Sequence, residues 1–110
     1  MKKKEGYIYL LCNALNEHYK IGMTTNTVKQ RISELQTGNA TEIFMVHQHK
    51  TKYPRRIETM LHNRFNSKRV LNEWFQLTAE DVINFPKTCQ EMENIIKTLE
   101  DNRLKNINKS

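Results

Sequence analysis

Two short apolar runs near the start of the chain, separated by a polar gap, most constrain how this sequence can fold. The first run is residues 6–11 (GYIYLL) and the second is residues 19–23 (YKIGM). Both are rich in Tyr, Ile and Leu, which favour strands, whereas the gap at residues 13–18 is rich in Asn and Glu. We therefore expect the two runs to pair as an antiparallel hairpin that forms the scaffold of the domain.

Three polar side chains lie on this hairpin where apolar side chains would be less costly to bury. Tyr7 and Tyr9 point to the same face of their strand, because side chains alternate along a strand. Lys20 lies inside the second strand, and lysine is seldom buried without a partner. The hairpin is thus expected to bring two phenols and an amine together.

These residues resemble the two motifs of the GIY-YIG nuclease family, which lie on neighbouring strands. The first motif is similar to residues 6–9 (GYIY) and the second to residues 20–22 (KIG). Eleven positions separate Tyr9 from Lys20, which is the spacing usual for the two tyrosines of the family. Lys20 stands where the family has its second tyrosine. In this respect the chain resembles a subgroup of small stand-alone members whose second motif reads K-I-G.

Two helices are predicted downstream, and each carries one charged residue in an unexpected place. Residues 27–37 should form the first helix, preceded by capping residues, and its apolar stripe includes Arg31. Residues 54–67 should form the second helix, where Glu58 borders the buried stripe. A charge in such a position is costly unless a partner meets it, so both residues are candidate functional groups.

The remaining segments predict strands and a C-terminal helix. Residues 41–49 should form a third strand, central or nearly central in the sheet, because their apolar run covers both faces. Residues 72–77 are expected to be a short strand or an extended segment. A further helix should begin near Ala79, be interrupted near Pro86 and continue to about Leu99, followed by a disordered end.

These elements predict an α+β fold of the sandwich type, with a small three-stranded, mainly antiparallel sheet flanked by helices. The expected order is strand, strand, helix, strand, helix, followed by a helical extension. At 110 residues the chain is expected to be a single domain over residues 1–110, with its core at about residues 5–77 and the extension at residues 78–110. No separate specificity domain is expected.

The composition excludes several classes of protein. No apolar run approaches the roughly 20 residues needed to cross a bilayer, so no membrane association is expected. We also find no secretion signal, and expect the protein to lie inside the cell, in the cytoplasm or with the nucleus or nucleoid. Cys12 and Cys89 are too few for a disulfide framework or a zinc site, and are expected to be reduced thiols.

The net charge of +6 is concentrated in one segment. Residues 50–69 hold seven basic residues against one acid, and the rest of the chain is balanced. A run of charge is often only a solvated face, but an unbalanced segment with histidines nearby favours contact with DNA phosphates. The candidate nucleic-acid-binding residues are Lys50, Lys52, Arg55, Arg56, His62, Arg64, Lys68 and Arg69.

The resemblance to GIY-YIG nucleases implies roles for individual residues. Tyr9 matches the tyrosine of the first motif, Lys20 replaces the second tyrosine, and Arg31 matches the arginine of the family's first helix. Glu58 matches the metal-binding glutamate of the following helix. The expected cofactor is therefore Mg²⁺, with Mn²⁺ as a substitute, since one carboxylate together with water and substrate phosphate commonly holds such an ion.

Two assignments stay open at this point. The group that orients or deprotonates the attacking water is Tyr7, Tyr9 or Lys20, and Lys20 qualifies only if its surroundings favour the neutral amine. His62 lies one helical turn after Glu58. We interpret it as a partner of Glu58 or a phosphate contact in preference to a metal ligand.

The sequence thus predicts a metal-dependent DNA endonuclease. The alternative is a module of the same fold that binds nucleic acid without cutting it, because the second tyrosine is missing. The resemblance covers about residues 5–77 and includes residues 73–75 (EWF), which resemble a closing motif of the K-I-G subgroup. Specificity is expected to come from DNA structure, from a second copy or from a partner protein, in DNA repair, recombination, homing or restriction.

Overall fold

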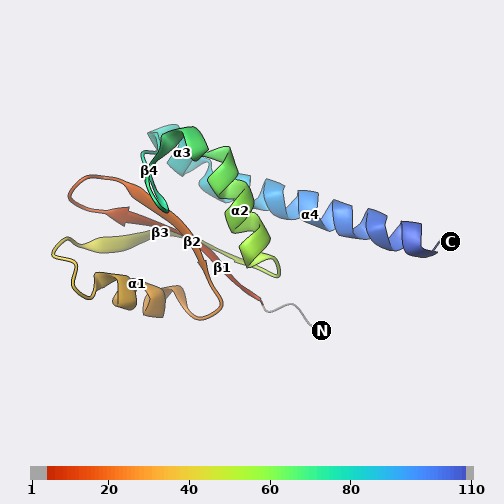
Figure 1. The fold of residues 1–110 in the computed structure, drawn as a ribbon, viewed down its shortest axis with the longest axis horizontal. Helices are drawn as coiled ribbons and strands as arrows, with labels where there is room; N and C mark the ends of the chain where they lie inside the picture. Colours follow the sequence, from red (N-terminus) through yellow and green to blue (C-terminus); the bar gives the residue numbers. More distant parts are fainter. Residues whose placement is uncertain (1–4, 109–110) are drawn as a thin grey trace.

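The computed structural model, which describes residues 5–108, contains a five-stranded antiparallel sheet with helices on both faces (Figure 1). The order of strands across the sheet is β3-β1-β2-β5-β4. The predicted hairpin is its centre, because β1 pairs with β2 along one side and with β3 along the other. In chain order the strands are β1 (Gly6–Asn13), β2 (Tyr19–Thr24), β3 (Ile43–Thr51), β4 (Arg69–Leu71) and β5 (Trp74–Phe75).

The helices form a layer on each face of this sheet (Figure 1). One face is covered by α1, and the other by α2 and α4, with the short α3 packed beside α4. None of the described helices is both long and apolar enough to cross a bilayer. The helices are α1 (Val28–Gln36), α2 (Pro54–Arg64), α3 (Ala79–Ile83) and α4 (Phe85–Asn108), and a single 3₁₀ turn, η1 (Asn66–Lys68), follows α2.

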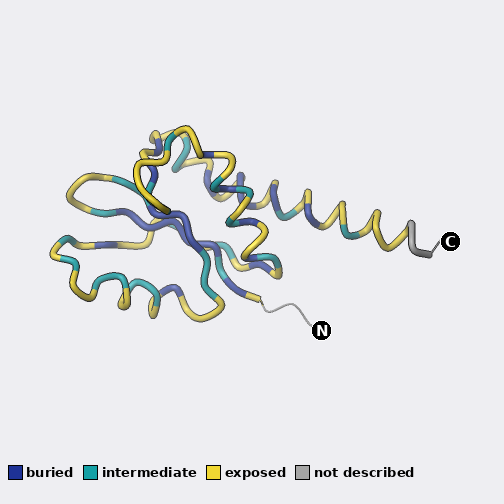
Figure 2. The backbone as a smooth tube through the Cα atoms, viewed as in Figure 1, coloured by how far each residue is buried: buried dark blue, intermediate teal, exposed yellow. Residues whose placement is uncertain are grey.

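The alternation of side chains along β1 divides the core into two clusters. Ile8 and Leu10 face α2 and α4, whereas Tyr9 and Leu11 face α1. All four side chains are buried, so the middle of β1 is covered on both faces (Figure 2). This arrangement places the Tyr9 hydroxyl in the layer between the sheet and α1.

The prediction of a three-stranded sheet is wrong, because β4 and β5 add two strands beyond β2. These strands have three and two residues, which is too short for an alternating pattern to be recognised. The overall class is still α+β. Residues 72–77, predicted as one strand or extended segment, contain the β5 strand and part of the turn that precedes it.

The prediction that the third strand is central is also wrong, because β3 lies at the edge of the sheet. Phe44 and Met45 are each 44% exposed. The register between β1 and β3 shifts between Leu10 and Leu11, which leaves an extra residue on β3 and bends the strand. An apolar run on both faces therefore does not mark a central strand here.

The C-terminal helix was predicted to stop near Leu99 but continues to Asn108, projecting from the body of the domain (Figure 1). Residues 100–105 contain no Gly or Pro, and Arg103 and Glu100 form an ion pair at i, i+3 spacing. The predicted interruption falls at Asn84, because Pro86 lies in the first turn of α4, where its missing N–H costs no helical hydrogen bond. The predicted disorder at Lys109 lies outside the described residues.

Candidate active site

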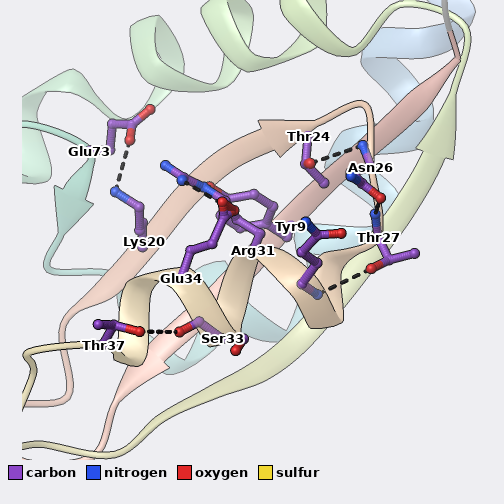
Figure 3. Close-up of polar contacts among 11 residues, drawn as sticks. Tyr9, Lys20, Thr24, Asn26, Thr27, Arg31, Ser33, Glu34, Thr37 and Glu73 are labelled. Carbon is purple, nitrogen blue, oxygen red and sulfur yellow. Dashed lines mark hydrogen bonds and ion pairs between the residues drawn. The ribbon is translucent and has the colours of Figure 1, made fainter.

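Three elements meet around the ring of Tyr9. The ring lies against Gly22 on β2, where an added Cβ would stand 2.3 Å from Tyr9 Oη. The Nε–H of Arg31 on α1 donates to the same oxygen at 3.3 Å (Figure 3). A Thr27 cap positions α1, because its Oγ1 accepts from the N–H of Gln30. The first predicted motif, the second motif and the first helix thus converge on one hydroxyl.

Lys20 lies on the same face of the sheet and donates to Glu73. The Nζ–Oε2 distance is 2.8 Å, and Lys20 is only 6% exposed (Figure 3). Glu73 stands in the turn between β4 and β5, after Asn72, whose φ of 52° is left-handed and suits an asparagine. The ammonium also lies 5.5 Å from the centre of the Trp74 ring. The buried amine therefore has the opposite charge that its position requires.

Side chains of α2 replace a neighbouring strand along part of β2. The pairing of β5 with β2 stops at Lys20. Beyond it, the N–H of Ile21 donates to the Glu73 carbonyl at 3.1 Å, and the Ile21 carbonyl accepts from His62 Nε2 at 2.8 Å. The Glu58 carboxylate accepts from the N–H of Met23. The backbone of this edge thereby places Glu58, His62 and Glu73 side by side.

These three residues form a cluster that could hold a metal ion. One nitrogen or oxygen atom from each of Glu58, His62 and Glu73 lies within 4.8 Å of the other two, and each residue is partly buried. Carboxylate oxygens suit hard divalent cations, and an imidazole nitrogen is also a common metal ligand. The donor set is therefore suited to a divalent cation.

The two carboxyl groups of the cluster have opposite pKa shifts. Burial raises the pKa of Glu58 to about 7, and the charge and hydrogen bond of Glu73 act in the same direction. Burial also tends to raise the pKa of Glu73, but the hydrogen bond and charge of Lys20 outweigh it, so the pKa is lowered. Near neutral pH the pair therefore shares one proton at the position where a cation would be bound.

Tyr9 is electrostatically linked to this cluster. Burial raises the pKa of Tyr9, whereas the hydrogen bond and charge of Arg31 partly oppose the shift, and both Glu58 and Glu73 act on the phenol. A phenol with a raised pKa keeps its proton at neutral pH. Tyr9 can therefore accept from Arg31 and donate to a bound group, but it is a poor base.

The structure brings together four of the five predicted catalytic residues, Tyr9, Lys20, Arg31 and Glu58. The fifth, Tyr7, lies on the same face of β1 but lines a mainly apolar cavity of ≈ 370 Å³ between α1 and β3.

From the sequence, His62 was predicted to be a partner of Glu58 or a phosphate contact in preference to a metal ligand, and Glu73 was placed in a closing motif. The spacing of His62 from Glu58 was a usable signal. Nothing in the sequence indicated that Glu73 comes from a turn to complete the cluster.

Five of the eight predicted nucleic-acid-binding residues contact groups of the protein itself, including His62 at the Ile21 carbonyl. Ion pairs join Lys50 to Glu5, Arg56 to Glu100 and Lys68 to Asp81. Arg69 contacts Asn66, the carbonyl of Asn72 and the ring of Phe75. Of the predicted residues, all of which the structure describes, Lys52, Arg55 and Arg64 are exposed and form no ion pair.

Comparison with curated proteins gives no match, and neither does comparison with solved structures. Comparison with family models gives one, the T5orf172 domain, which matches residues 6–105 and therefore includes every residue of the site. The chain belongs to the T5orf172 domain family.

Proposed function

We propose that the protein is a metal-dependent endonuclease that hydrolyses DNA phosphodiester bonds by a GIY-YIG-type mechanism. The observation that supports this most directly is the convergence of Tyr9, Arg31, Lys20 and Glu58 around one stretch of β2. The T5orf172 domain occurs in nuclease-like proteins associated with the GIY-YIG family. The residues that converge resemble the motifs of that family, with Lys20 in place of the second tyrosine.

Arg31 is the group best placed to meet a phosphate. Its side chain is 37% exposed, and its Nε–H is already directed to Tyr9, which holds the guanidinium plane in one orientation. The remaining N–H groups of the fork match the spacing of phosphate oxygens. Arg31 would thus bind the scissile phosphate and stabilise the additional negative charge of the transition state.

Glu58, within the cluster of two carboxyls and an imidazole, would hold Mg²⁺ or Mn²⁺. When bound, the cation polarises the phosphate and lowers the pKa of a water molecule. The protein's part is to hold Glu58 at the strand edge through the N–H of Met23, and to keep Glu73 ionised through Lys20. A carboxyl with a pKa of about 7 is one that exchanges its proton for a cation readily.

Among the three candidates for activating water, the geometry favours Tyr9 as an orienting group. Lys20 is engaged as the donor of a hydrogen bond to Glu73, and Tyr7 lines the cavity under α1. The Tyr9 hydroxyl lies beside Arg31, and hence beside the expected phosphate. We propose that Tyr9 positions the water or a phosphate oxygen by hydrogen bonding.

The test is a cleavage assay on supercoiled, linear and branched DNA with Mg²⁺ or Mn²⁺. Cutting is expected with either ion and not with EDTA, and Glu58→Gln should cut slower by orders of magnitude while binding DNA as well as the parent. Gln keeps the shape and helix propensity of Glu, so the melting temperature is a sufficient control of folding. If the parent binds all three DNAs but cuts none, the protein is a non-cleaving module, a result that Lys20 in place of the second tyrosine would explain.

A further inference from the structure

We infer that Glu58, His62 and Glu73 together bind the cation, with His62 Nδ1 as a nitrogen ligand, and that the site consequently prefers a first-row transition ion to Mg²⁺. This inference rests on the proposed function, because it specifies the cation of the same site. The observation behind it is that the imidazole of His62, held in one orientation by a hydrogen bond, lies beside two hydrogen-bonded carboxyls.

The three ligand atoms are close enough to share one ion. One oxygen of each glutamate and one nitrogen of the His62 ring lie within 4.8 Å of one another. Three ligand atoms about 2.1 Å from one ion are typically about 3–4 Å apart. Closing that difference takes a shift of less than about one ångström for each atom, which rotations of the glutamate side chains supply without moving the backbone.

The hydrogen bond of His62 is the kind that orients a metal-binding histidine. Its Nε2 lies 2.8 Å from the carbonyl of Ile21, and a carbonyl only accepts, so Nε2 carries the hydrogen. In the neutral ring the lone pair is then on Nδ1. Packing against Phe75, with ring centres 5.2 Å apart, further limits rotation of the imidazole. A backbone acceptor on one nitrogen with the other nitrogen left for metal is a common outer-shell arrangement.

The two carboxylates repel each other unless a positive group lies between them. Glu58 and Glu73 each place an oxygen in the same cluster, where two negative charges are unfavourable without a cation. Their outer contacts are already made, from Met23 N–H to Glu58 and from Lys20 to Glu73. A carboxylate has more acceptor positions than these contacts use, so oxygen lone pairs of both residues remain for a cation.

The chemistry of this ligand set decides which ion is preferred. Mg²⁺ demands oxygen ligands in near-ideal octahedral geometry and keeps most of its waters. Imidazole nitrogen binds first-row transition ions better, and two carboxylates are compatible with either class. His62 therefore discriminates against Mg²⁺, so the Mg²⁺ expected from the sequence would support activity but bind more weakly.

Mn²⁺ is the probe, because it is paramagnetic and an echo-modulation EPR spectrum reports a directly bonded nitrogen. The intact protein with bound Mn²⁺ should show ¹⁴N modulation, which changes to the ¹⁵N pattern when the protein is made with ¹⁵N-histidine. His62→Gln should lose the modulation. His47→Gln is the matched control, because His47 is on β3, outside the cluster, and it should keep the parent spectrum.

Competition between ions gives a second readout. In titrations that follow displacement of Mn²⁺ by Mg²⁺, His62→Gln should reduce the preference for Mn²⁺ by about tenfold or more. Each variant is compared with the parent by thermal melting. Should His62→Gln fail to fold, Gln variants of the other three histidines, His18, His47 and His49, decide the question, because each should keep the nitrogen modulation if His62 is the ligand.

The outcomes separate this inference from the proposed nuclease function. DNA cleavage together with bound Mn²⁺ that shows no nitrogen modulation overturns the inference and leaves the function intact. Nitrogen modulation without cleavage of any DNA supports the ligand set and overturns the function. Failure of the parent to bind Mn²⁺ at all overturns the inference.

Discussion

Tyr9 and Gly22 face each other across β1 and β2, and the tyrosine ring occupies the space that any side chain at position 22 would need. A Cβ at that position would lie 2.3 Å from the Tyr9 hydroxyl oxygen, 2.5 Å from ring atom Cζ and 2.7 Å from ring atom Cε1. The glycine of the K-I-G motif is thus required by its neighbour. It allows the phenol to lie flat along the strand and to reach Arg31.

Replacing Gly22 with Ala should therefore displace Tyr9. Over-packing at a buried site typically costs about 1–3 kcal/mol of unfolding free energy, and DNA cleavage should be lost because the hydroxyl leaves Arg31. Thermal melting and a cleavage assay measure the two effects. Gly38→Asn is the control, because the space around Gly38 is open and asparagine tolerates its φ of 76°. A Gly22→Ala protein that melts and cuts like the parent would contradict this account.

Removing only the hydroxyl of Tyr9 should separate chemistry from folding. Tyr9→Phe keeps the ring over Gly22 but removes the partner of the Arg31 Nε–H. We expect a fall in cleavage rate of about 10²-fold with little change in DNA affinity. Tyr19→Phe, on the opposite face of the sheet, should cut normally. Equal rates for both variants would exclude a role of the Tyr9 hydroxyl.

Glu58 should make stability depend on pH in the opposite sense to an ordinary salt-bridged acid. Its folded-state pKa is about 7 against a usual 4.5, so the folded protein keeps a proton that the unfolded chain releases. Below about pH 4.5 the carboxyl does not lower the free energy of unfolding, and its destabilising effect grows as the pH rises through 7. After allowance for its partial exposure, the cost at pH 8 is on the order of 1 kcal/mol.

Glu58→Gln should accordingly be more stable than the parent at pH 8 and equal to it at pH 4. Denaturant unfolding of both proteins at the two pH values measures this difference. A divalent cation at the site should narrow the gap at pH 8, because it stabilises the ionised carboxylate of the parent. A constant difference at both pH values would show that burial of the charge is not its cause.

Arg55 and Arg56 are adjacent in sequence but should contribute unequally to DNA binding. Arg56 is paired with Glu100 at 2.8 Å, whereas the exposed Arg55 lies near Glu58 and acts on its charge. Each phosphate neutralised on duplex DNA contributes about −0.9 to the slope of log affinity against log salt concentration. Arg55→Gln should remove about that amount, and Arg56→Gln less. If both variants keep the slope of the parent, the DNA lies away from this end of α2.

The elements predicted correctly are those with a long apolar period or a capping signal. The hairpin and both helices flanking β3 are close to their predicted bounds, and the Thr78 capping box starts α3 as expected. The strand pair β4 and β5 is held by contacts with β2 that no local pattern encodes. The place of each strand in the sheet could not be predicted from the sequence either. The burial of β1 and the exposure of β3 depend on which strand has a neighbouring strand on both sides.

The candidate site likewise contains residues that could be predicted from the sequence and residues that could not. Arg31 and Glu58 could be predicted because each breaks the apolar stripe of its own helix. Glu73 could not, because its position depends on the left-handed turn at Asn72 and on a lysine far away in the sequence. The role of His62 depends on the carbonyl of Ile21, which becomes available only because β5 is short.

The edge of β2 has a consequence for solubility. A strand edge with unpaired N–H and carbonyl groups is a template for pairing with another chain. In this fold Glu58 and His62 occupy two of those groups, at Met23 and Ile21. Truncation of either side chain to alanine would therefore leave a backbone group open to intermolecular β-pairing, and inactive variants of that kind are expected to aggregate on storage. Residues proposed to act in DNA cleavage thus also prevent the sheets of two molecules from pairing at this edge.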